Sequence, residues 1–322
     1  MTAPLSVLVL TMNEELNIAA CLDSIVGWAA DIVVVDSGST DRTADLCAER
    51  GVRTVFHPYV DHRTQKDWAL TSIPWRHEWL LLLDADHVVT PDLRQAIERM
   101  LHTDRRRVHG YYNRHIHYFR NRRVRGLKRY YLQLVRRSRV RIDETDLVDG
   151  RLIVDGPTAK LPGAIIENNQ KELDIDFWID KHQKFARRIA IEEILRVEAA
   201  VGGEAAVSPR VFGHPDERSA WLKKVWYGTP LYLRAVLFFL YRYLVRLGFL
   251  DGWNGLVFHG FQTFWFRLLV DVNIENYRAQ VRANEISLEE LSRMVGRGPV
   301  KNRSADAGPA LRRDDAREVR HG

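Results

Sequence analysis

Cysteine is scarce in this sequence, which has only Cys21 and Cys47 among 322 residues. Two cysteines at this separation supply neither the ligand spacing of a zinc site nor a disulfide framework, so a small disulfide-stabilised domain is excluded. Both fall in segments expected to be helical. We therefore expect two buried thiols in a reducing compartment.

Long uninterrupted apolar runs are also missing. A membrane-spanning helix needs about 20 mainly apolar residues, and Arg234, Arg242 and Arg246 interrupt the longest aromatic-rich stretch. The opening segment MTAPLSVLVLTMNEE has no basic residues ahead of its apolar run, which predicts no signal peptide. These features favour residence in the cytoplasm.

Two common phosphate-binding signatures are absent. No G-x-G-x-x-G follows the first predicted strand, which argues against a dinucleotide cofactor. No G-x-x-x-x-G-K-[ST] occurs either, which argues against a P-loop.

The most informative stretch is EWLLLLDADHVVTPD, in which an apolar run at 79–83 stops at Asp84 and Asp86. A short, continuously apolar run is typical of a strand buried on both faces of a parallel sheet. Two carboxylates at about 4 Å repel each other by roughly 4 kcal/mol at an effective dielectric near 20. Mg²⁺ or Mn²⁺ bound by Asp84 and Asp86 together with substrate phosphates relieves this repulsion, whereas the alternative is a solvated loop.

Predicted strands alternate with helices through the first hundred residues. Strands are expected at 5–10, 32–35, 52–56 and 79–83, and helices near 18–26, 42–50 (with Ser39 or Thr40 as N-cap) and 63–71. This alternation predicts an α/β fold with a parallel sheet, in which ligands bind at the carboxyl ends of the strands. Three polar loops follow strands and should converge there: Asn13 with Glu14, the loop 36–41, and Asp84 with Asp86.

At this point the residues carry a family resemblance. The segments TMNEELNIAACLDSI, DIVVVDSGSTDRTADLC, QKDWAL and LLLLDADHVVTPDL follow one another as in family 2 glycosyltransferases of the GT-A fold, which residues 5–92 resemble. The resemblance implies a Rossmann-like, mostly parallel sheet and a UDP-linked sugar donor. It also assigns roles by position: Thr11, Asn13 and Glu14 along the nucleotide, Asp36 and Ser37 at the base or ribose, Lys66 near the phosphates, Asp84 at the ribose or diphosphate, and Asp86 on the Mg²⁺ or Mn²⁺ ion with Asp84.

Positive charge gathers in the middle of the chain. The formal net charge is +6, and basic residues crowd 105–141, where two predicted strands at 110–119 and 128–135 flank an arginine-rich turn at 121–126. This hairpin is either simply solvated or binds an anionic acceptor or anionic lipid headgroups. No recognised RNA- or DNA-binding pattern accompanies it, so nucleic acid is not expected.

An acidic cluster follows the hairpin and contains Asp143, Glu144, Asp146 and Asp149. Inverting sugar transfer needs a carboxylate that takes the proton from the acceptor hydroxyl. The lipopolysaccharide-core β-glucosyltransferases that this chain resembles carry a Val-His-Glu pattern in this region, and registering the following LIVDG segment with theirs places Asp149 at the glutamate, although this chain departs from the pattern with Val148-Asp149-Gly150. Asp149 is therefore the first candidate for the base, with Asp146 and Glu144 as alternatives.

Four regions are predicted along the chain. Residues 1–200 form the catalytic domain, with its acceptor side from about residue 105, and 201–220 form a connector. Residues 221–280 are dense in aromatics and predict amphipathic helices at a membrane interface, with their arginines directed outward to the lipid phosphates; the alternative is a helical hairpin packed on the catalytic domain. This segment also resembles the lipopolysaccharide-core enzymes, which act on lipid-linked acceptors at the cytoplasmic face of the inner membrane. Residues 296–322 are charged and predict a disordered tail.

The sequence therefore predicts an inverting glycosyltransferase that moves a sugar to a lipid-linked saccharide of lipopolysaccharide core or surface polysaccharide, peripherally on the inner membrane. One alternative is a sugar-phosphate nucleotidyltransferase, although TMNEE is not the glycine-rich loop that such enzymes need after the first strand. Another is a non-enzymatic membrane-peripheral module that binds RNA or anionic lipid through the basic hairpin.

Overall fold

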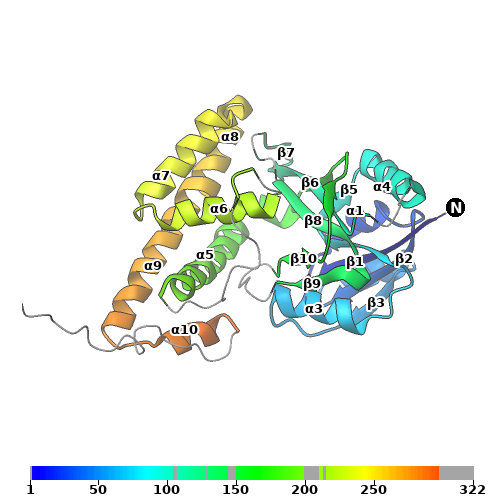
Figure 1. Ribbon diagram of the computed structural model, residues 1–322, viewed down its shortest axis with the longest axis horizontal. Helices are drawn as coiled ribbons and strands as arrows, with labels where there is room; N and C mark the ends of the chain where they lie inside the picture. Colours follow the sequence, from blue (N-terminus) through cyan, green and yellow to red (C-terminus); the bar gives the residue numbers. More distant parts are fainter. Residues whose placement is uncertain are drawn as a thin grey trace, which may run out of the picture.

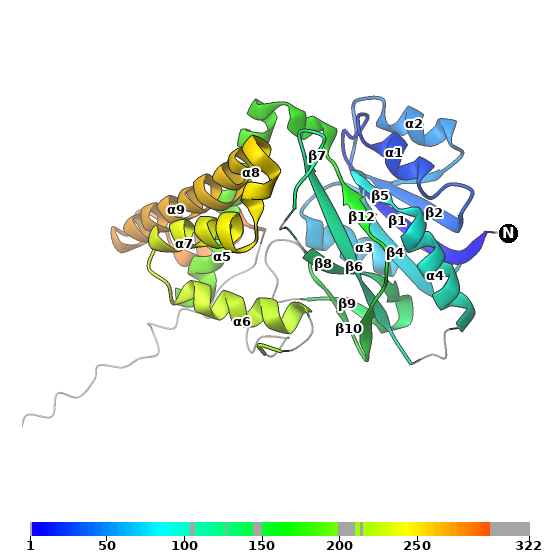
Figure 2. The same ribbon diagram turned by 90° about the horizontal axis from the view of Figure 1, so that it is seen from above.

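The computed structural model describes residues 2–103, 107–125, 127, 129–143, 150–198, 210–212 and 215–296. A sheet-containing part and a helical part lie side by side, with the N-terminus on the side of the sheet away from the helices (Figures 1 and 2). The candidate bases Glu144, Asp146 and Asp149 lie outside the described residues, as do residues 201–209 of the predicted connector and the predicted tail beyond Gly296.

A mixed sheet is the centre of the larger part. Its strand order within the described chain is β3-β2-β1-β4-β8-β6-β12-β5, with β7 and β11 paired to β6. The short strands β9 and β10 form a second sheet. The bounds are β1 Ala3–Thr11, β2 Ala29–Asp36, β3 Arg53–Phe56, β4 Trp79–Asp84, β5 His87–Val89, β6 Gly110–Phe119, β7 Arg122–Arg123, β8 Arg129–Arg136, β9 Val140–Ile142, β10 Leu152–Val154, β11 Thr158–Lys160 and β12 Ile165–Glu167.

The first four strands are parallel, since β1 pairs with β2 and β4, and β2 pairs with β3. The predicted α/β fold with a mostly parallel sheet flanked by helices is thereby confirmed. Beyond β4 the sheet becomes mixed, because β8 runs antiparallel to both β4 and β6. The pair β6 and β8 is the predicted basic hairpin. It extends the sheet formed by the first four strands, because β8 pairs with β4.

Helices cover both faces of the sheet. One core cluster joins the sheet to α1 (Ile18–Asp23), α2 (Thr43–Glu49) and α4 (Pro91–Thr103), and the other joins its opposite face to α3 (His62–Ser72) and to β9 and β10. Cys21 and Cys47 are free and buried in the first cluster.

One predicted cap is wrong. We expected Ser39 or Thr40 to cap the second helix, but α2 begins at Thr43, whose main-chain N–H donates to Asp41 Oδ1 at 3.0 Å. The Ser39 hydroxyl instead donates to the Asp36 carboxylate, and the Thr40 amide donates to Asn13. Ser39 and Thr40 are therefore engaged by Asp36 and Asn13, and neither caps α2.

The helical part is built on two long helices, α5 and α9. Ala186 and Ile194 of α5 pack with Phe266, Val270 and Ile274 of α9 in a separate core. The bounds are α5 Ile175–Glu198, α6 Pro215–Tyr227, α7 Leu233–Leu240, α8 Gly252–His259, α9 Phe266–Arg282 and α10 Leu288–Met294, with 3-10 turns at Arg137–Arg139, Gln170–Leu173 and Gly248–Asp251 and π-helical turns at Tyr241–Val245 and Gly260–Trp265. Helix α6 begins within the predicted connector.

The expectation that the arginines of the aromatic segment point outward is wrong for Arg234. Its side chain is 1% exposed, and its Nε and Nη1 donate to Asp271 at 2.8 Å and to Glu193 at 2.6 Å. Acids from α9 and α5 thus neutralise a buried cation, which ties the segment to α5. Across the described residues, no helix has the length and apolarity needed to span a membrane.

Candidate active site

The carboxyl ends of three parallel strands bring the predicted loops to one edge. Thr11 at the end of β1 pairs with Asp36 at the end of β2, and Leu10 pairs with Asp84 at the end of β4. The Thr11 hydroxyl is buried, and no described residue is its hydrogen-bond partner. The structure therefore collects residues from the three polar loops along one edge of the sheet.

Asp36 organises its own loop. Its carboxylate accepts from the main-chain N–H of Gly38 at 3.0 Å and of Ser39 at 2.9 Å, and from the Ser39 hydroxyl. Gly38 adopts φ +98°, a conformation that glycine reaches at little cost. The Ser37 hydroxyl accepts from Nε2 of Gln65 at 2.9 Å, which ties this loop to α3.

Asn13 and Glu14 are held by the same loop and by a distant segment. The Asn13 amide N–H donates to the Ser39 hydroxyl at 2.8 Å, and its side-chain oxygen accepts from the Thr40 N–H at 2.7 Å. The Glu14 carboxylate forms an ion pair with Lys171. These side chains are preorganised before any ligand is bound.

The centre of the site is Asp84, Asp86 and His87. The Asp84 main-chain N–H donates to Nδ1 of His87 at 2.9 Å, so the proton of the neutral imidazole sits on Nε2. That nitrogen lies 3.8 Å from Asp84 Oδ2 and 3.9 Å from Asp86 Oδ1. His87 therefore directs Nε2 between the two carboxylates, and the oxygen atoms of Asp84 and Asp86 are placed where they could hold a metal ion.

The electrostatics of the two carboxylates differ. Burial, together with the negative charges of Glu167 and Asp84, raises the pKa of Asp86 to about 6 in spite of His87. Burial also disfavours the charged form of Asp84, but His87, Lys66 and His62 outweigh it and lower the Asp84 pKa. An excess of negative charge at Asp86 and an all-oxygen donor set match a hard divalent cation such as Mg²⁺ or Mn²⁺.

A second cluster adjoins the first, and the sequence analysis missed it. Glu167 Oε2 lies 3.0 Å from Nδ1 of His115 and 3.0 Å from Nδ1 of His117. Burial opposes the charge of Glu167, but hydrogen bonds from the two imidazoles hold its pKa well below the usual range. His115 and His117 alternate along a strand and therefore share one face. This His-x-His spacing within a predicted strand was the available signal.

A run of amides was also missed. Asn169 Nδ2 donates to Asp86 Oδ2 at 3.1 Å, while its side-chain oxygen accepts from Asn17 at 3.1 Å. Gln170 Nε2 donates to Asn121 at 2.9 Å, at the tip of the basic hairpin. The segment after β12 therefore connects the Asp86 carboxylate to Asn17, just before the first helix, and to the hairpin.

Of the acidic cluster proposed to hold the base, only Asp143 is described. Its carboxylate is fully buried and accepts from Nε of Arg151 at 2.9 Å, which makes it a structural ion pair and unsuitable as the base. Gly150, the next described residue, packs so closely that a Cβ there would lie 2.7 Å from the Arg63 Cα. Glu144, Asp146 and Asp149 lie between these two anchored ends and stay predictions.

Comparison with known proteins places this site in a family. Residues 6–148 match the family described as Glycosyl transferase family 2. A glycosyltransferase of Rickettsia bellii with no assigned function is 32% identical over 98 residues, which are 30% of this chain and 33% of that protein. The lipopolysaccharide core biosynthesis glycosyltransferase LpsC of Rhizobium meliloti is 34% identical over 103 residues, which are 30% of this chain and 37% of LpsC.

These relatives are matched over about a third of their length. Among solved structures, glucosyl-3-phosphoglycerate synthase from Mycobacterium tuberculosis, in complex with Mn²⁺, UDP and glucosyl-3-phosphoglycerate, is 16% identical with a TM-score of 0.38, covering 60% of this chain and 79% of that chain. That score is too low to extend its ligands to this protein. The family match and the glycosyltransferase relatives, on a site whose carboxylates end the fourth parallel strand, identify residues 6–148 as a glycosyl transferase family 2 domain.

Proposed function

We propose that this protein is an inverting glycosyltransferase that moves a sugar from a UDP-sugar to a lipid-linked saccharide acceptor, with Mg²⁺ or Mn²⁺ as cofactor. The observation that carries the proposal is the placement of Asp84 and Asp86 at the carboxyl end of β4, inside a family 2 domain. The charge of Lys66 reaches Asp84, as expected for a side chain beside a diphosphate.

In the proposed reaction the acceptor oxygen bonds to the anomeric carbon while the bond from that carbon to the diphosphate oxygen breaks. The electron pair leaves with the nucleoside diphosphate, and the acceptor proton passes to a carboxylate, for which Asp149 is the first candidate and Asp146 and Glu144 are alternatives. When bound at Asp84 and Asp86, the metal ion stabilises the charge of the leaving diphosphate. Lys66 adds a second positive charge on the same side.

Two observations support a lipid-linked acceptor in lipopolysaccharide core or surface polysaccharide. The relative LpsC is named for lipopolysaccharide core biosynthesis. In addition, α7, the two turns after it and the start of α8 expose a series of large apolar side chains, of which Trp253 on α8 is 81% and Val245 69% exposed. The others include Leu233, Leu237, Leu240, Leu244, Leu247, Phe249 and Leu250.

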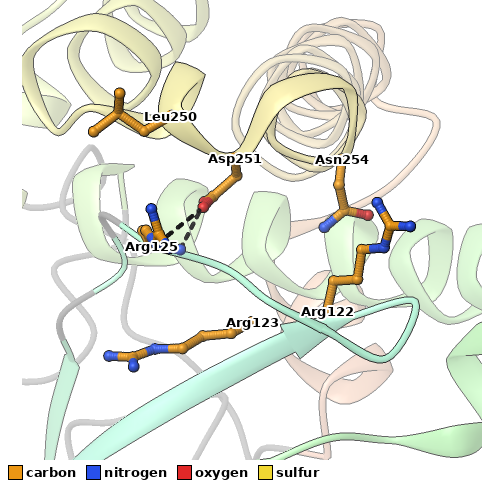
Figure 3. A pocket seen from close by; sticks show the side chains of 6 residues that line it. All are labelled: Arg122, Arg123, Arg125, Leu250, Asp251 and Asn254. Atoms are coloured by element: carbon orange, nitrogen blue, oxygen red, sulfur yellow. Dashed lines mark hydrogen bonds and ion pairs between the residues drawn. The ribbon is translucent and has the colours of Figure 1, made fainter.

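Positive charge borders this apolar surface. Arg122, Arg123 and Arg125 at the hairpin tip line an open cavity of about 390 Å³ with Leu250, Asp251 and Asn254 (Figure 3). The Arg125 main-chain N–H donates to Asp251 Oδ2 at 2.7 Å, which fixes the tip against the turn. Apolar side chains beside arginines suit an anionic bilayer, where each well-placed arginine adds about 1 kcal/mol. We therefore place the protein peripherally on the cytoplasmic face of the inner membrane.

The test is turnover of nucleotide sugars by the full chain. UDP-glucose, UDP-galactose, UDP-N-acetylglucosamine and GDP-mannose are each incubated with Mn²⁺ and with lipopolysaccharide of truncated core, and transfer to the lipid fraction is followed by mass spectrometry. We expect one UDP-sugar to give a mass increase of one hexose or one N-acetylhexosamine residue, which the chelator EDTA abolishes. Absence of transfer from every donor, with the protein folded, would contradict the proposal.

A further inference from the structure

Four basic side chains meet where the basic hairpin faces the helical part. Arg242 belongs to the π-helical turn after α7, Arg267 to α9, His259 to the end of α8, and Arg129 to the exposed strand β8. The charge of Arg129 acts on both Arg242 and Arg267. These four residues are called the junction cluster below.

Arg242 is buried against Phe238, whose ring centroid lies 5.9 Å from its Cζ, with two donor nitrogens unsatisfied. Its side chain is 9% exposed, and neither Nε nor Nη2 has a hydrogen-bond partner among the described residues. Burial, followed by repulsion from Arg129 and Arg246, lowers its pKa to about 10. A buried guanidinium without an acceptor costs several kcal/mol in general. An anion that enters the cluster would offset this cost.

His259 repeats the pattern beside it. It is fully buried, and both ring nitrogens lack a partner in the described part of the chain. Burial and the charge of Arg242 lower its pKa to about 4, so it stays neutral at pH 7. Gly248 leaves room for the ring, since a Cβ there would lie 2.4 Å from Nε2.

Arg267 is the third member with an unsatisfied donor. Its buried Nε has no partner among the residues described, and aromatic rings surround the guanidinium. The centroids of Trp226, Phe238 and Phe266 lie 5.5, 5.6 and 5.2 Å from its Cζ. Burial and the charges of Arg129 and Arg234 lower its pKa to about 10.

Arg234 shows that the same helices can neutralise a buried arginine. Its guanidinium is saturated by Asp271 and Glu193, yet no such carboxylate hydrogen-bonds to the buried Nε of Arg242 or of Arg267 within the described chain. Arg242 lies within the π-helical turn Tyr241–Val245, and the second such turn, Gly260–Trp265, lies between His259 and Arg267 in the sequence; π-turns within helices are frequent at functional sites. The unsatisfied donors are therefore better explained by a missing ligand than by packing.

We propose that Arg242, Arg267 and Arg129 bind a phosphoryl group carried by the acceptor. A phosphate supplies two negative charges and several acceptor oxygens, which match planar guanidinium donors. Phosphate binding is inferred from the residues of the junction cluster alone. The assignment of that phosphate to the acceptor rests on the proposed transferase function.

The position of the cluster suits an acceptor. Arg129 Nη1 donates to the Tyr131 hydroxyl at 3.1 Å, and the Tyr131 ring lies 4.6 Å from that of His115. The His115 ring is 4.9 Å from His87, which points between Asp84 and Asp86. On its other side the cluster adjoins α7, whose outer face exposes Leu237 and Leu240. A phosphate here would lie between the apolar surface and the carboxylates.

The proposal is tested by calorimetric titration of the full chain with inorganic phosphate and with dihexanoyl phosphatidic acid, and with dihexanoyl phosphatidylcholine as the matched zwitterionic lipid. EDTA is present, so no metal at Asp86 can hold the phosphate. We expect binding of phosphatidic acid that falls at least tenfold in Arg242→Met and in Arg267→Met. The exposed control Arg282→Met should bind as the wild type does. Stronger binding of the lipid than of inorganic phosphate would identify a lipid-borne group, and equal binding would identify free phosphate as sufficient.

Thermal unfolding separates this role from a structural one. Arg242→Met removes an uncompensated charge, so its Tm without ligand should equal or exceed that of the wild type, whereas Arg234→Met should unfold several degrees lower. Wild-type protein that binds neither phosphate probe would overturn the proposal, and so would Arg242→Met that binds phosphate as the wild type does. Titration of the same proteins, freed of EDTA, with UDP and Mn²⁺ tests the transferase function independently, since loss of UDP binding leaves the phosphate result intact.

Discussion

His87 accepts a hydrogen bond at Nδ1 from the main-chain N–H of Asp84, at 2.9 Å, and thereby turns its Nε2–H toward the carboxylates of Asp84 and Asp86. The imidazole thereby holds the end of β4 and lies within 4 Å of both carboxylates. In metal sites, groups that orient the ligands commonly change metal affinity by 10- to 100-fold.

Replacement of His87 should therefore weaken the metal site. We expect His87→Asn to lower the affinity for Mn²⁺, measured by calorimetry in the presence of UDP, by about tenfold or more. The control His102→Asn, on α4 away from the site, should leave the affinity unchanged. Equal Mn²⁺ affinity in His87→Asn and wild type would remove His87 from the metal site.

Asp86 should make the metal-free protein less stable as the pH rises. Its pKa is about 6 when folded and 3.8 as a free side chain, so the folded state binds the proton more tightly. Stability is thus lost between about pH 4 and pH 6, and a shift of this size corresponds to about 3 kcal/mol. In EDTA, urea denaturation should show wild type weakening over this range and Asp86→Asn weakening less, with the variant the more stable at pH 7. The same change of stability with pH in wild type and in Asp86→Asn over this range would contradict the assignment.

Glu167 should stabilise the fold through its two imidazole partners. In Glu167→Gln the hydrogen bonds to His115 and His117 become neutral, and loss of a charge-assisted bond costs about 1.5–3 kcal/mol. We expect a lower urea midpoint than that of wild type at pH 7, and an unchanged midpoint in the exposed control Glu289→Gln. Because the pKa of Glu167 is depressed, its contribution is present above the usual carboxylate range and is lost as pH falls through the folded pKa. A wild-type midpoint in Glu167→Gln would show that the network is energetically neutral.

The apolar surface that runs from α7 through the following turns to Trp253 on α8 should bind anionic membranes. Trp253→Glu and Val245→Glu place charge on exposed positions, so neither should disturb the core. We expect both variants to lose flotation with phosphatidylglycerol vesicles, while Phe56→Glu, exposed on β3 at the far end of the sheet, floats as the wild type does (Figure 1). Flotation of all three variants alike would place the membrane contact elsewhere.

Features that depend on residues close together in the sequence were predicted correctly, whereas features that depend on residues far apart in the sequence were not. Strand β6 has the predicted bounds Gly110–Phe119, because alternation and buried runs are local signals. The cap on α2 was mispredicted because Ser39 bonds to Asp36 and Asn13, the latter 26 residues away. Arg234 was expected to face lipid headgroups, because the local sequence does not reveal its two acidic partners. They lie 37 and 41 residues away along the chain.

The residues of the site show the same difference between local and long-range signals. Asp84 and Asp86 could be found from a strand that ends in two carboxylates, since both lie in one short segment. Glu167 and Asn169 join them only through the pairing of β12 with β5, in which Glu167 pairs with His87. No local sequence pattern predicts that pairing, so the approach of Glu167 and Asn169 to Asp86 could be seen only in the structure.

The most direct test of the account is calorimetric titration of the purified protein with UDP, GDP, dTDP and CMP, each with and without Mn²⁺, in wild type and Asp86→Ala. The account predicts selective binding of UDP that requires Mn²⁺ and is lost in Asp86→Ala, while that variant keeps the wild-type circular dichroism spectrum. Failure of the folded wild type to bind any of these nucleotides with Mn²⁺, or undiminished Mn²⁺-dependent UDP binding by Asp86→Ala, would contradict it.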